Sequence, residues 1–576
     1  GCNPGKHRVF DFLIPDRKSY MPKLCSATIS PSLHNLDIGP YRIPLGKPQI
    51  RFERKSQSFW KILGDHGVFS TIQRVPITFP PEKFHGLLLS AMSVPDLLGT
   101  QGTFSYYSSD EGDEHTVTGG AVVQINLEDG AYHGQIDGPE NPFRCDGQKL
   151  CINFTLEPLG NGEGVRLRIG GREHRLDLRC FTPWILLEFR AGFRMKIRGL
   201  CRFYLLEQTP HMRLYMSPVN IDPENPVLPI SHPATYSMYL AKTQGRFSTL
   251  GLAEDTWALN ERVLDEDAFL EQAYLVHEER EKMFLDAIEK TERGVAVCVF
   301  DITDRVQHMF WRYLEKDHPA NMGKDVTRHQ SAIFDVYEKM DELVGRVMQN
   351  ASDDTVVLVM SDHGFKSFQR GVNLNSWLHQ EGYLTVHSGP SGAEWFTEVD
   401  WKKTRAYAVG LGGIYLNVRG REAQGIVDEG GAVQSLKDEI REKLIALSDS
   451  QFDRLAVGHV YDTSEAYSGP YSEEGPDLIV GFKEGYRASW TSITGAVTKA
   501  VFEDNSKSWS GDHCINPPDV PGVLFCSRKI KVNEATIMDI APSVLDLFGV
   551  PIPSFMDGIS LFPDQSNALS RETGKD

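Results

Sequence analysis

The chain of 576 residues is long enough for two domains, or for one large domain with an insertion. Its hydrophobic fraction of 40% and charged fraction of 24% are ordinary for a soluble globular protein. The formal net charge of −18 argues against a nucleic-acid-binding or membrane-surface protein, because both need basic patches and none is evident. No apolar run approaches the roughly 18 residues that span a bilayer, so no membrane segment is expected.

The nine cysteines are odd in number and irregularly spaced, with no C-x-x-C pair. This pattern fits a reducing compartment better than a disulfide framework, and cytoplasmic location is therefore expected. A signal peptide stays open, because we expect the natural N-terminus to lie before Gly1.

The first hundred residues predict helix–strand alternation, with a helix at 56–63 and a strand at 68–75. From about residue 100 the pattern changes to short alternating segments separated by Gly, Asn and Asp. These predicted strands are 116–125, 150–156, 165–169, 174–178 and 185–189. Closely spaced short strands indicate a sandwich or barrel, so residues 100–233 are interpreted as a β-rich insertion, either a lid or a decoration.

Helical spacing returns at 264–288, with Phe269, Tyr274, Leu275 and Phe284 as the expected buried stripe. The apolar run GVAVCVFDI at 294–302 follows and continues into Asp304 and His308. If a helix begins where the strand ends, these two side chains lie one turn apart on one face, which is chelating geometry. The alternative is an N-capping Asp304 and a surface histidine.

A long amphipathic helix at 325–349 leads directly into VVLVMSDHGF at 356–365. Its apolar part predicts a strand buried on both faces, because it is too short for a core helix. Asp362 and His363 follow immediately, where the ligands of an open parallel sheet gather. Taken alone, Asp-His-Gly is also a common strand-terminating turn. Two strands that each end in an Asp/His pair favour a metal centre.

The C-terminal third continues the α/β pattern and adds one more histidine. A strand pair at 405–418, a helix at 431–447 and a short strand at 477–481 are predicted. The loop WSGDH at 509–513 then brings His513, and Cys514 beside it is expected to pack behind the site. A helix at 537–548 closes the fold, and the polar tail at 565–576 is expected to be disordered.

Several of these segments resemble the type I phosphodiesterase/nucleotide pyrophosphatase branch of the alkaline phosphatase superfamily. They are FDITDRVQHMFW (300–311), VLVMSDHGF (357–365), SGDH (510–513) and DIAPSVLDLFGVPIPSFMDG (539–558). The opening GCNPGKHRVFDF and RAYAVGLGGIYLNVRGRE (405–422) are also similar. The resemblance implies an alkaline-phosphatase-like, mostly parallel central sheet with helices on both faces. Residues 1–99 and 234–564 would form this α/β core, with the β-rich insertion between them.

The resemblance also implies a site with two zinc ions. Asp304, His308 and His513 are similar to the ligands of one ion, and Asp362 and His363 to two ligands of the second. In this family the second ion takes a further Asp and activates a Thr or Ser nucleophile. Both are expected upstream of Gly1, so the chain is interpreted as an N-terminally truncated fragment, inactive as it stands. Arg305 is expected to be a surface residue or to contact a ligand.

The sequence therefore predicts a metal-dependent hydrolase of phosphate esters, acting on phosphodiester or nucleotide pyrophosphate bonds in small substrates. Sulfatases and phosphomutases of the same superfamily are alternatives. Sulfatases hold one calcium ion through oxygen ligands, whereas three histidines favour zinc. A catalytically incomplete binding protein is the alternative from another class. The oligomeric state stays open.

Overall fold

The computed structural model describes residues 1–30, 34–46, 49–112, 117–160, 162, 164–192, 195–532 and 534–563. Their contacts divide the chain into two compact units: unit 1 comprises Gly1–Ser26, Glu53–Val68 and Gln307–Asp576, and unit 2 comprises Ala27–Phe52 and Phe69–Val306. The predicted division into a core (1–99 and 234–564) and an insertion (100–233) stays a prediction. The predicted disordered tail at 565–576 lies outside the described residues.

A small sheet of unit 2 carries the strand that leads toward Asp304. Its order is β21–β8–β7–β22, and β7 pairs in parallel with both β8 and β22. The strands are β7 (Ser70–Gln73), β8 (Gly86–Leu89), β21 (Ser231–His232) and β22 (Val295–Cys298). The helices of this unit are α3 (Thr235–Gln244), α4 (Thr256–Asn260) and α5 (Glu266–Lys290).

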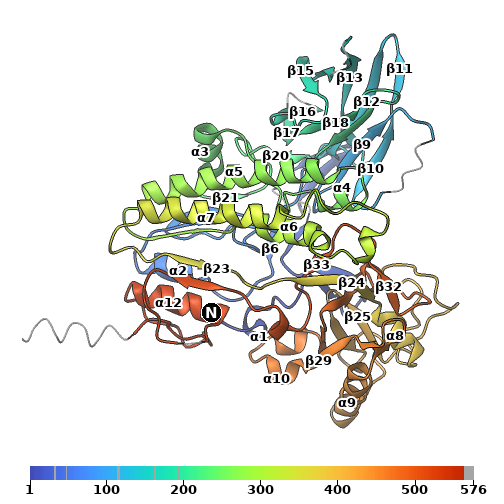
Figure 1. The fold of residues 1–576 in the computed structure, drawn as a ribbon, viewed down its shortest axis with the longest axis vertical. Coiled ribbons are helices and arrows are strands. Elements are labelled where there is room, and N and C mark those ends of the chain that lie inside the picture. Colours follow the sequence, from blue (N-terminus) through green and yellow to red (C-terminus); the bar gives the residue numbers. More distant parts are fainter. Residues whose placement is uncertain are drawn as a thin grey trace, which may run out of the picture. The chain divides into compact units, whose positions relative to one another are not determined.

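The rest of unit 2 is β-rich, and each of the five strands predicted between residues 116 and 189 has a counterpart there. Figure 1 shows these strands together, in cyan and teal, away from α3. They are β9 (Phe104–Ser108), β10 (Gly120–Gln124), β11 (Asn126–Glu128), β12 (Ala131–Glu140), β13 (Lys149–Pro158), β14 (Gly164–Ile169), β15 (Arg172–Asp177), β16 (Ile185–Gly192), β17 (Met195–Cys201), β18 (Phe203–Glu207), β19 (Arg213–Met216) and β20 (Asn220–Ile221). Residue 116 itself lies outside the described residues.

The alternating pattern of β14 shows why this region folds as strands. Val165, Leu167 and Ile169 are buried, whereas Arg166 and Arg168 are exposed. A strand turns successive side chains to opposite faces, so this sequence covers one core with one face of a sheet. The core beneath it also takes side chains from β13 and β16.

Two antiparallel strand pairs at the start of unit 2 were not predicted. β3 (Ala27–Ser30) pairs with β6 (Gln49–Phe52), and β4 (Asn35–Ile38) pairs with β5 (Tyr41–Pro44). Isolated Pro and Gly residues interrupt this segment, and its strands are too short to show a clear period.

The predicted helices are present, with small differences in their bounds. Helix α5 begins after Asp265, whose carboxylate accepts the N–H of Ala268 as an N-cap. Phe269 is buried as predicted, but Tyr274, Leu275 and Phe284 are half-buried. The buried stripe instead runs through Ala268, Phe269, Gln272, Ala273, Val276, His277, Arg280, Met283 and Ala287.

Helix α7 (Ala332–Asn350) begins seven residues later than predicted. The reason is local: the Asp325 carboxylate accepts both the N–H and the hydroxyl of Thr327, which holds a turn instead of helix.

Unit 1 contains the remaining elements, again in several small sheets. Its helices are α1 (Pro4–His7), α2 (Phe59–Asp65), α7, α8 (Leu374–Gln380), α9 (Gly431–Ile445), α10 (Thr463–Ala466), α11 (Trp490–Ile493) and α12 (Ile540–Leu547). Its strands are β1 (Leu13–Pro15), β2 (Pro22–Leu24), β23 (Leu358–Met360), β24 (Lys366–Val372), β25 (Ala406–Val409), β26 (Gly413–Leu416), β27 (Ser448–Asp449), β28 (Arg454–Leu455), β29 (Val457–Asp462), β30 (Leu478–Phe482), β31 (Gly485–Ala488), β32 (Phe502–Asp504), β33 (Gly511–Asp512) and β34 (Leu524–Cys526). The fold is therefore mixed α/β, and the expected large central parallel sheet stays a prediction.

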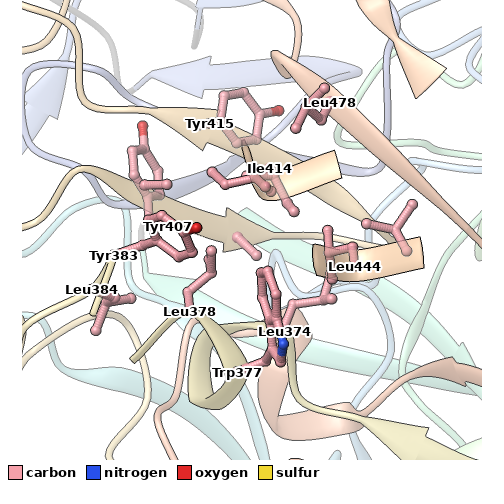
Figure 2. Close-up of a cluster of buried hydrophobic side chains, with 14 of the residues drawn as sticks. Leu374, Trp377, Leu378, Tyr383, Leu384, Tyr407, Ile414, Tyr415, Leu444 and Leu478 are labelled. Carbon is pink, nitrogen blue, oxygen red and sulfur yellow. The ribbon is translucent and has the colours of Figure 1, made fainter. Parts of the chain in front are cut away.

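The hydrophobic core of unit 1 lies between the antiparallel sheet β25–β26–β30–β29 and helices α8 and α9. Figure 2 shows its centre, where Tyr407 and Ile414 from the sheet face Leu378 and Leu444 from the helices. These side chains are at most 1% exposed. Burying an aliphatic or aromatic side chain contributes about 1.5–3 kcal/mol, so this cluster anchors the sheet on its helices.

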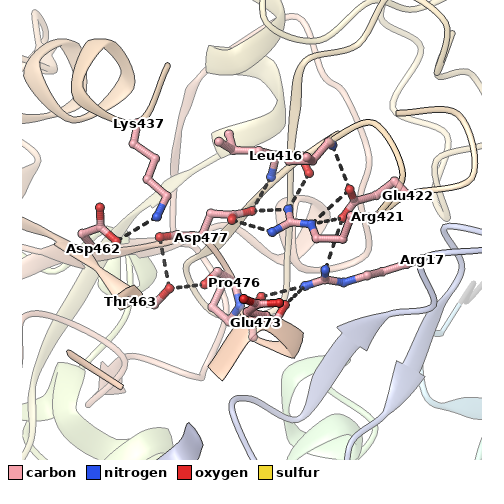
Figure 3. Close-up of polar contacts among 12 residues, drawn as sticks. Arg17, Leu416, Arg421, Glu422, Lys437, Asp462, Thr463, Glu473, Pro476 and Asp477 are labelled. Atoms are coloured by element: carbon pink, nitrogen blue, oxygen red, sulfur yellow. Dashed lines mark hydrogen bonds and ion pairs between the residues drawn. The ribbon is translucent and has the colours of Figure 1, made fainter. Parts of the chain in front are cut away.

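A buried polar network joins β26 to the residue before β30. Arg421 donates to both carboxylate oxygens of Asp477, over 2.8 and 2.7 Å, and through Nε to Glu422 over 2.9 Å (Figure 3). The N–H of Leu416 donates to the same Asp477 carboxylate. Paired, charge-assisted hydrogen bonds of this kind offset the cost of burying the charges and set the strand register.

Within the described part of the chain, no helix is long and apolar enough to cross a membrane. All nine cysteines have free thiols.

Candidate metal centre

Helix α6 (Ile302–Phe310) begins a few residues after β22 ends and carries Asp304 and His308. The two residues are one helical turn apart, as their spacing predicts. His308 is 2% exposed, and its Nδ1 lies 2.8 Å from the carbonyl oxygen of Gly511. A carbonyl only accepts, so Nδ1 carries the proton and the lone pair of the neutral ring is at Nε2.

The loop at 509–514 packs directly on α6. The N–H of Ser510 donates to the His308 carbonyl over 2.6 Å, and the Ser510 hydroxyl accepts the N–H of Arg312 over 3.0 Å. A Cβ on Gly511 would stand 2.5 Å from the Gln307 carbonyl oxygen, so this approach requires glycine. The short strand β33 then pairs with the start of β24, which fixes the direction of the chain into His513.

This packing brings His308, His363 and His513 together. The rings of His308 and His513 have centroids 5.2 Å apart, and His363 stacks on His513 at 3.5 Å with the ring planes 8° apart. Phe365 lies against all three rings, at 4.8 to 5.4 Å. The cluster thus combines nitrogen donors with an apolar wall.

Asp304 joins this cluster through the helix it shares with His308. Asp304, His308 and His513 each offer one ligand atom, and these atoms lie within 4.8 Å of one another. One carboxylate and two imidazoles form a common donor set for zinc, with a further position left for water or substrate. Because these three ligand atoms lie so close together, the residues present fit a metal ion.

Asp362 and His363 follow β23, which pairs antiparallel with β34. His363 Nδ1 lies 3.1 Å from the Gly364 carbonyl, and its Nε2 lies 3.5 Å from Asp362 Oδ1. The Asp362 side chain is 73% exposed. In the described ranges, Asp362 and His363 belong to no group of three close ligand atoms, so their assignment to a second ion stays a prediction.

A second close group consists of the neighbours Asp512, His513 and Cys514. Burial raises the pKa of the Cys514 thiol well above its usual range, which disfavours the thiolate that binds metals. Burial alone would also raise the pKa of Asp512, but the Arg487 guanidinium and the neighbouring imidazoles outweigh it and hold that pKa well below its usual range. Asp512 is therefore a buried anion beside the centre.

Arg305 is buried, at 6% exposed, and contacts a residue of the centre, which is one of the two expected alternatives. Its Nη1 lies 3.3 Å from Asp304 Oδ2, and its Nε lies 3.8 Å from Glu254 Oε2. Glu254, Arg487 and the role of Asp512 were not predicted from the sequence. One sequence feature could have pointed to Asp512: the Asp-His dipeptide at 362–363 recurs at 512–513.

The comparisons with known proteins bear on this region directly. Residues 232–502 match the family model described as type I phosphodiesterase / nucleotide pyrophosphatase. The matched segment includes α6 and the Asp362–His363 pair and ends shortly before His513. Neither the search of curated proteins nor the search of solved structures found a match. Residues 232–502 are thus similar to the type I phosphodiesterase / nucleotide pyrophosphatase family, as the motifs indicated.

Proposed function

We propose that this protein is a metal-dependent hydrolase of phosphate esters, acting on phosphodiester or nucleotide pyrophosphate bonds in small substrates. The family that residues 232–502 match supports the reaction class. The observation that carries the proposal is the grouping of Asp304, His308 and His513 around one point.

In this proposal Asp304, His308 and His513 hold one zinc ion, and Asp362 and His363 contribute to a second. Zinc is preferred because the donors are rich in imidazole, whereas calcium takes oxygen ligands. When bound, such ions stabilise the charge on phosphoryl oxygens and lower the pKa of a hydroxyl or water. An alkaline-phosphatase-like arrangement of the core and cytoplasmic location belong to the same proposal.

The residues of the chain prepare the site in two ways. The Gly511 carbonyl holds His308 in the tautomer that presents Nε2. Phe365 packs edge-on against the imidazoles and gives the site an apolar wall. In this proposal the attacking group is a Thr or Ser hydroxyl, which none of the five ligand residues supplies.

Metal binding is the first test. We expect the protein to bind zinc, measured by competition with a chromophoric chelator, and His513→Ala to weaken this binding at least about a hundredfold, since altering residues that merely support ligands already costs 10–100-fold. His387→Ala is the matched control, because His387 is exposed. No zinc binding by the wild-type protein would contradict the proposal.

Ligand preference is the second test. The zinc-loaded protein is expected to bind inorganic phosphate and a nucleoside monophosphate in calorimetry, and the chelated protein to lose both. Tighter binding of sulfate than of phosphate would favour the sulfatase alternative. Binding of the nucleotide by the metal-free protein would favour a binding protein.

A further inference from the structure

The carboxylate of Asp512 determines where His513 points. Its Oδ1 accepts the backbone N–H of His513 over 2.8 Å and that of Cys514 over 2.9 Å. Two hydrogen bonds from consecutive N–H groups to the preceding side chain hold the chain in a tight turn. The direction of the His513 side chain therefore depends on the position of Asp512.

The other carboxylate oxygen is engaged as well. Oδ2 accepts Trp509 Nε1 over 2.8 Å and pairs with Arg487 Nε over 2.7 Å, and the side chain is 1% exposed. A carboxylate has about four lone-pair sites. Three N–H groups donate hydrogen bonds to this one, and the Arg487 guanidinium forms an ion pair with it. A metal ion at Asp512 would have to displace one of these contacts, although the residue lies beside His513.

The donors around Asp512 are themselves held in place. Arg487 donates through Nη1 to the Ala488 carbonyl over 3.1 Å, and its guanidinium lies over the rings of Phe368 and Trp490, at 5.0 and 4.4 Å. This side chain is 4% exposed. A planar guanidinium fixed on aromatic faces loses little further freedom when it pairs, so it is a firm support for the carboxylate.

Trp509 extends the same support to the second imidazole. Its indole N–H donates to Asp512, and its ring lies against that of His308, with centroids 3.8 Å apart. One buried carboxylate is therefore connected to both histidines: to His513 through the backbone, and to His308 through the indole.

We propose that Asp512, supported by Arg487, is a positioning residue of the metal centre rather than one of its ligands. This inference rests on the proposed function. In this role Asp512 holds the two imidazoles at the separation that one ion needs, so that the site rearranges little when the ion binds.

The test compares two carboxylate-to-amide variants of unit 1. Asp512→Asn places an amide N–H₂ against the Trp509 or Arg487 donors. Asp449→Asn is the matched control, since Asp449 is 2% exposed and pairs with Arg370 over 2.9 and 3.2 Å. We expect Asp512→Asn to weaken zinc binding 10–100-fold and to change the visible absorption of the cobalt(II)-loaded protein. Asp449→Asn should change neither, while both variants lower the melting temperature of the metal-free protein.

Each outcome has one reading. If the wild-type protein binds no zinc, the proposed function fails. If the wild-type protein binds zinc and Asp512→Asn binds it equally well, the positioning role is wrong. If both variants lose zinc affinity equally, the loss reflects reduced stability in general, and the positioning role of Asp512 is also wrong. Should Asp512→Asn not fold, Trp509→Phe removes one donor and keeps the ring, and it is expected to shift the cobalt spectrum with a smaller loss of affinity.

Discussion

His308 shows how one hydrogen bond determines which atom of a side chain can react. The Gly511 carbonyl accepts from Nδ1, so the neutral ring presents its lone pair at Nε2 before any ligand arrives. His363 Nδ1 also lies beside a backbone carbonyl, that of Gly364. Neutral imidazoles are the form that binds metal ions.

Asp255 is a buried carboxylate of unit 2, remote in sequence from the centre. It accepts the Tyr215 hydroxyl over 2.7 Å and caps α4 through the N–H of Ala258. Burial outweighs these hydrogen bonds and raises its pKa to about 6. The folded-state pKa thus lies above the unfolded-state value. The stability that this raised pKa contributes is fully present below the unfolded-state pKa of Asp255. It is lost as the pH rises through about 6.

Between pH 5 and pH 7.5 we therefore expect the free energy of unfolding of the wild-type protein to fall by about 1–2 kcal/mol more than that of Asp255→Asn. Asparagine still caps α4 through its side-chain oxygen, so the variant should fold. The measurement is the melting temperature of both proteins at both pH values. Parallel decreases would show that Asp255 is not the group responsible.

At the scale of elements, α6 and the loop at 509–514 are joined by hydrogen bonds. The loop bonds to the last turns of the helix through Ser510 and places the Gly511 carbonyl against His308. Because Gly511 has no side chain, its backbone reaches the helix surface. The separation of His308 and His513 therefore depends on one backbone contact.

Glycine substitutions test this contact. Gly511→Ala places a Cβ 2.5 Å from the Gln307 oxygen and 2.8 Å from Trp311 Cβ, so we expect a loss of about 1–3 kcal/mol in stability and weaker zinc binding. Gly345→Ala is the control, since Gly345 lies exposed in α7 and its Cβ would meet no atom within 4 Å. It should stabilise by about 0.5–1 kcal/mol, because alanine favours helix. Melting temperatures and zinc titrations distinguish the two, and a neutral Gly511→Ala would contradict the argument.

At the scale of the molecule, the candidate centre combines residues that are far apart in the chain. His308 and His513 come from segments separated by most of unit 1, and each is supported by its own neighbours. An unfolded chain holds these donors at no defined distance. A metal ion should therefore bind the folded state selectively and stabilise it.

Zinc is accordingly expected to raise the unfolding free energy by about 2.7 kcal/mol when its free concentration is a hundred times the dissociation constant. Differential scanning fluorimetry over a zinc series, with a chelator as the reference, gives the measurement. His513→Ala should lose most of this increase, and His387→Ala should retain it. An increase of equal size in all three proteins would show that zinc binds elsewhere.

The sequence by itself determined the local parts of this protein. The four-residue spacing of Asp304 and His308 places both on one helical face, because a helix repeats every 3.6 residues. The alternation of β14 follows from the two-residue period of a strand, and the buried stripe of α5 follows from the helical period. The exact buried positions of α5 did not follow from the sequence. The motifs FDITDRVQHMFW and VLVMSDHGF, which lie within residues 232–502, indicated the family that the model matches there.

Only the tertiary structure decided which donors meet and which atoms are free. It brought His513 and His363 into contact, left the Asp362 carboxylate 73% exposed, and surrounded Asp512 with three N–H donors and the Arg487 guanidinium. It also buried Arg305 against Glu254. None of these follows from local pattern, because a side chain's partners across the fold depend on how distant segments pack. Local periodicity fixes the face on which a residue lies, whereas packing fixes what that face meets.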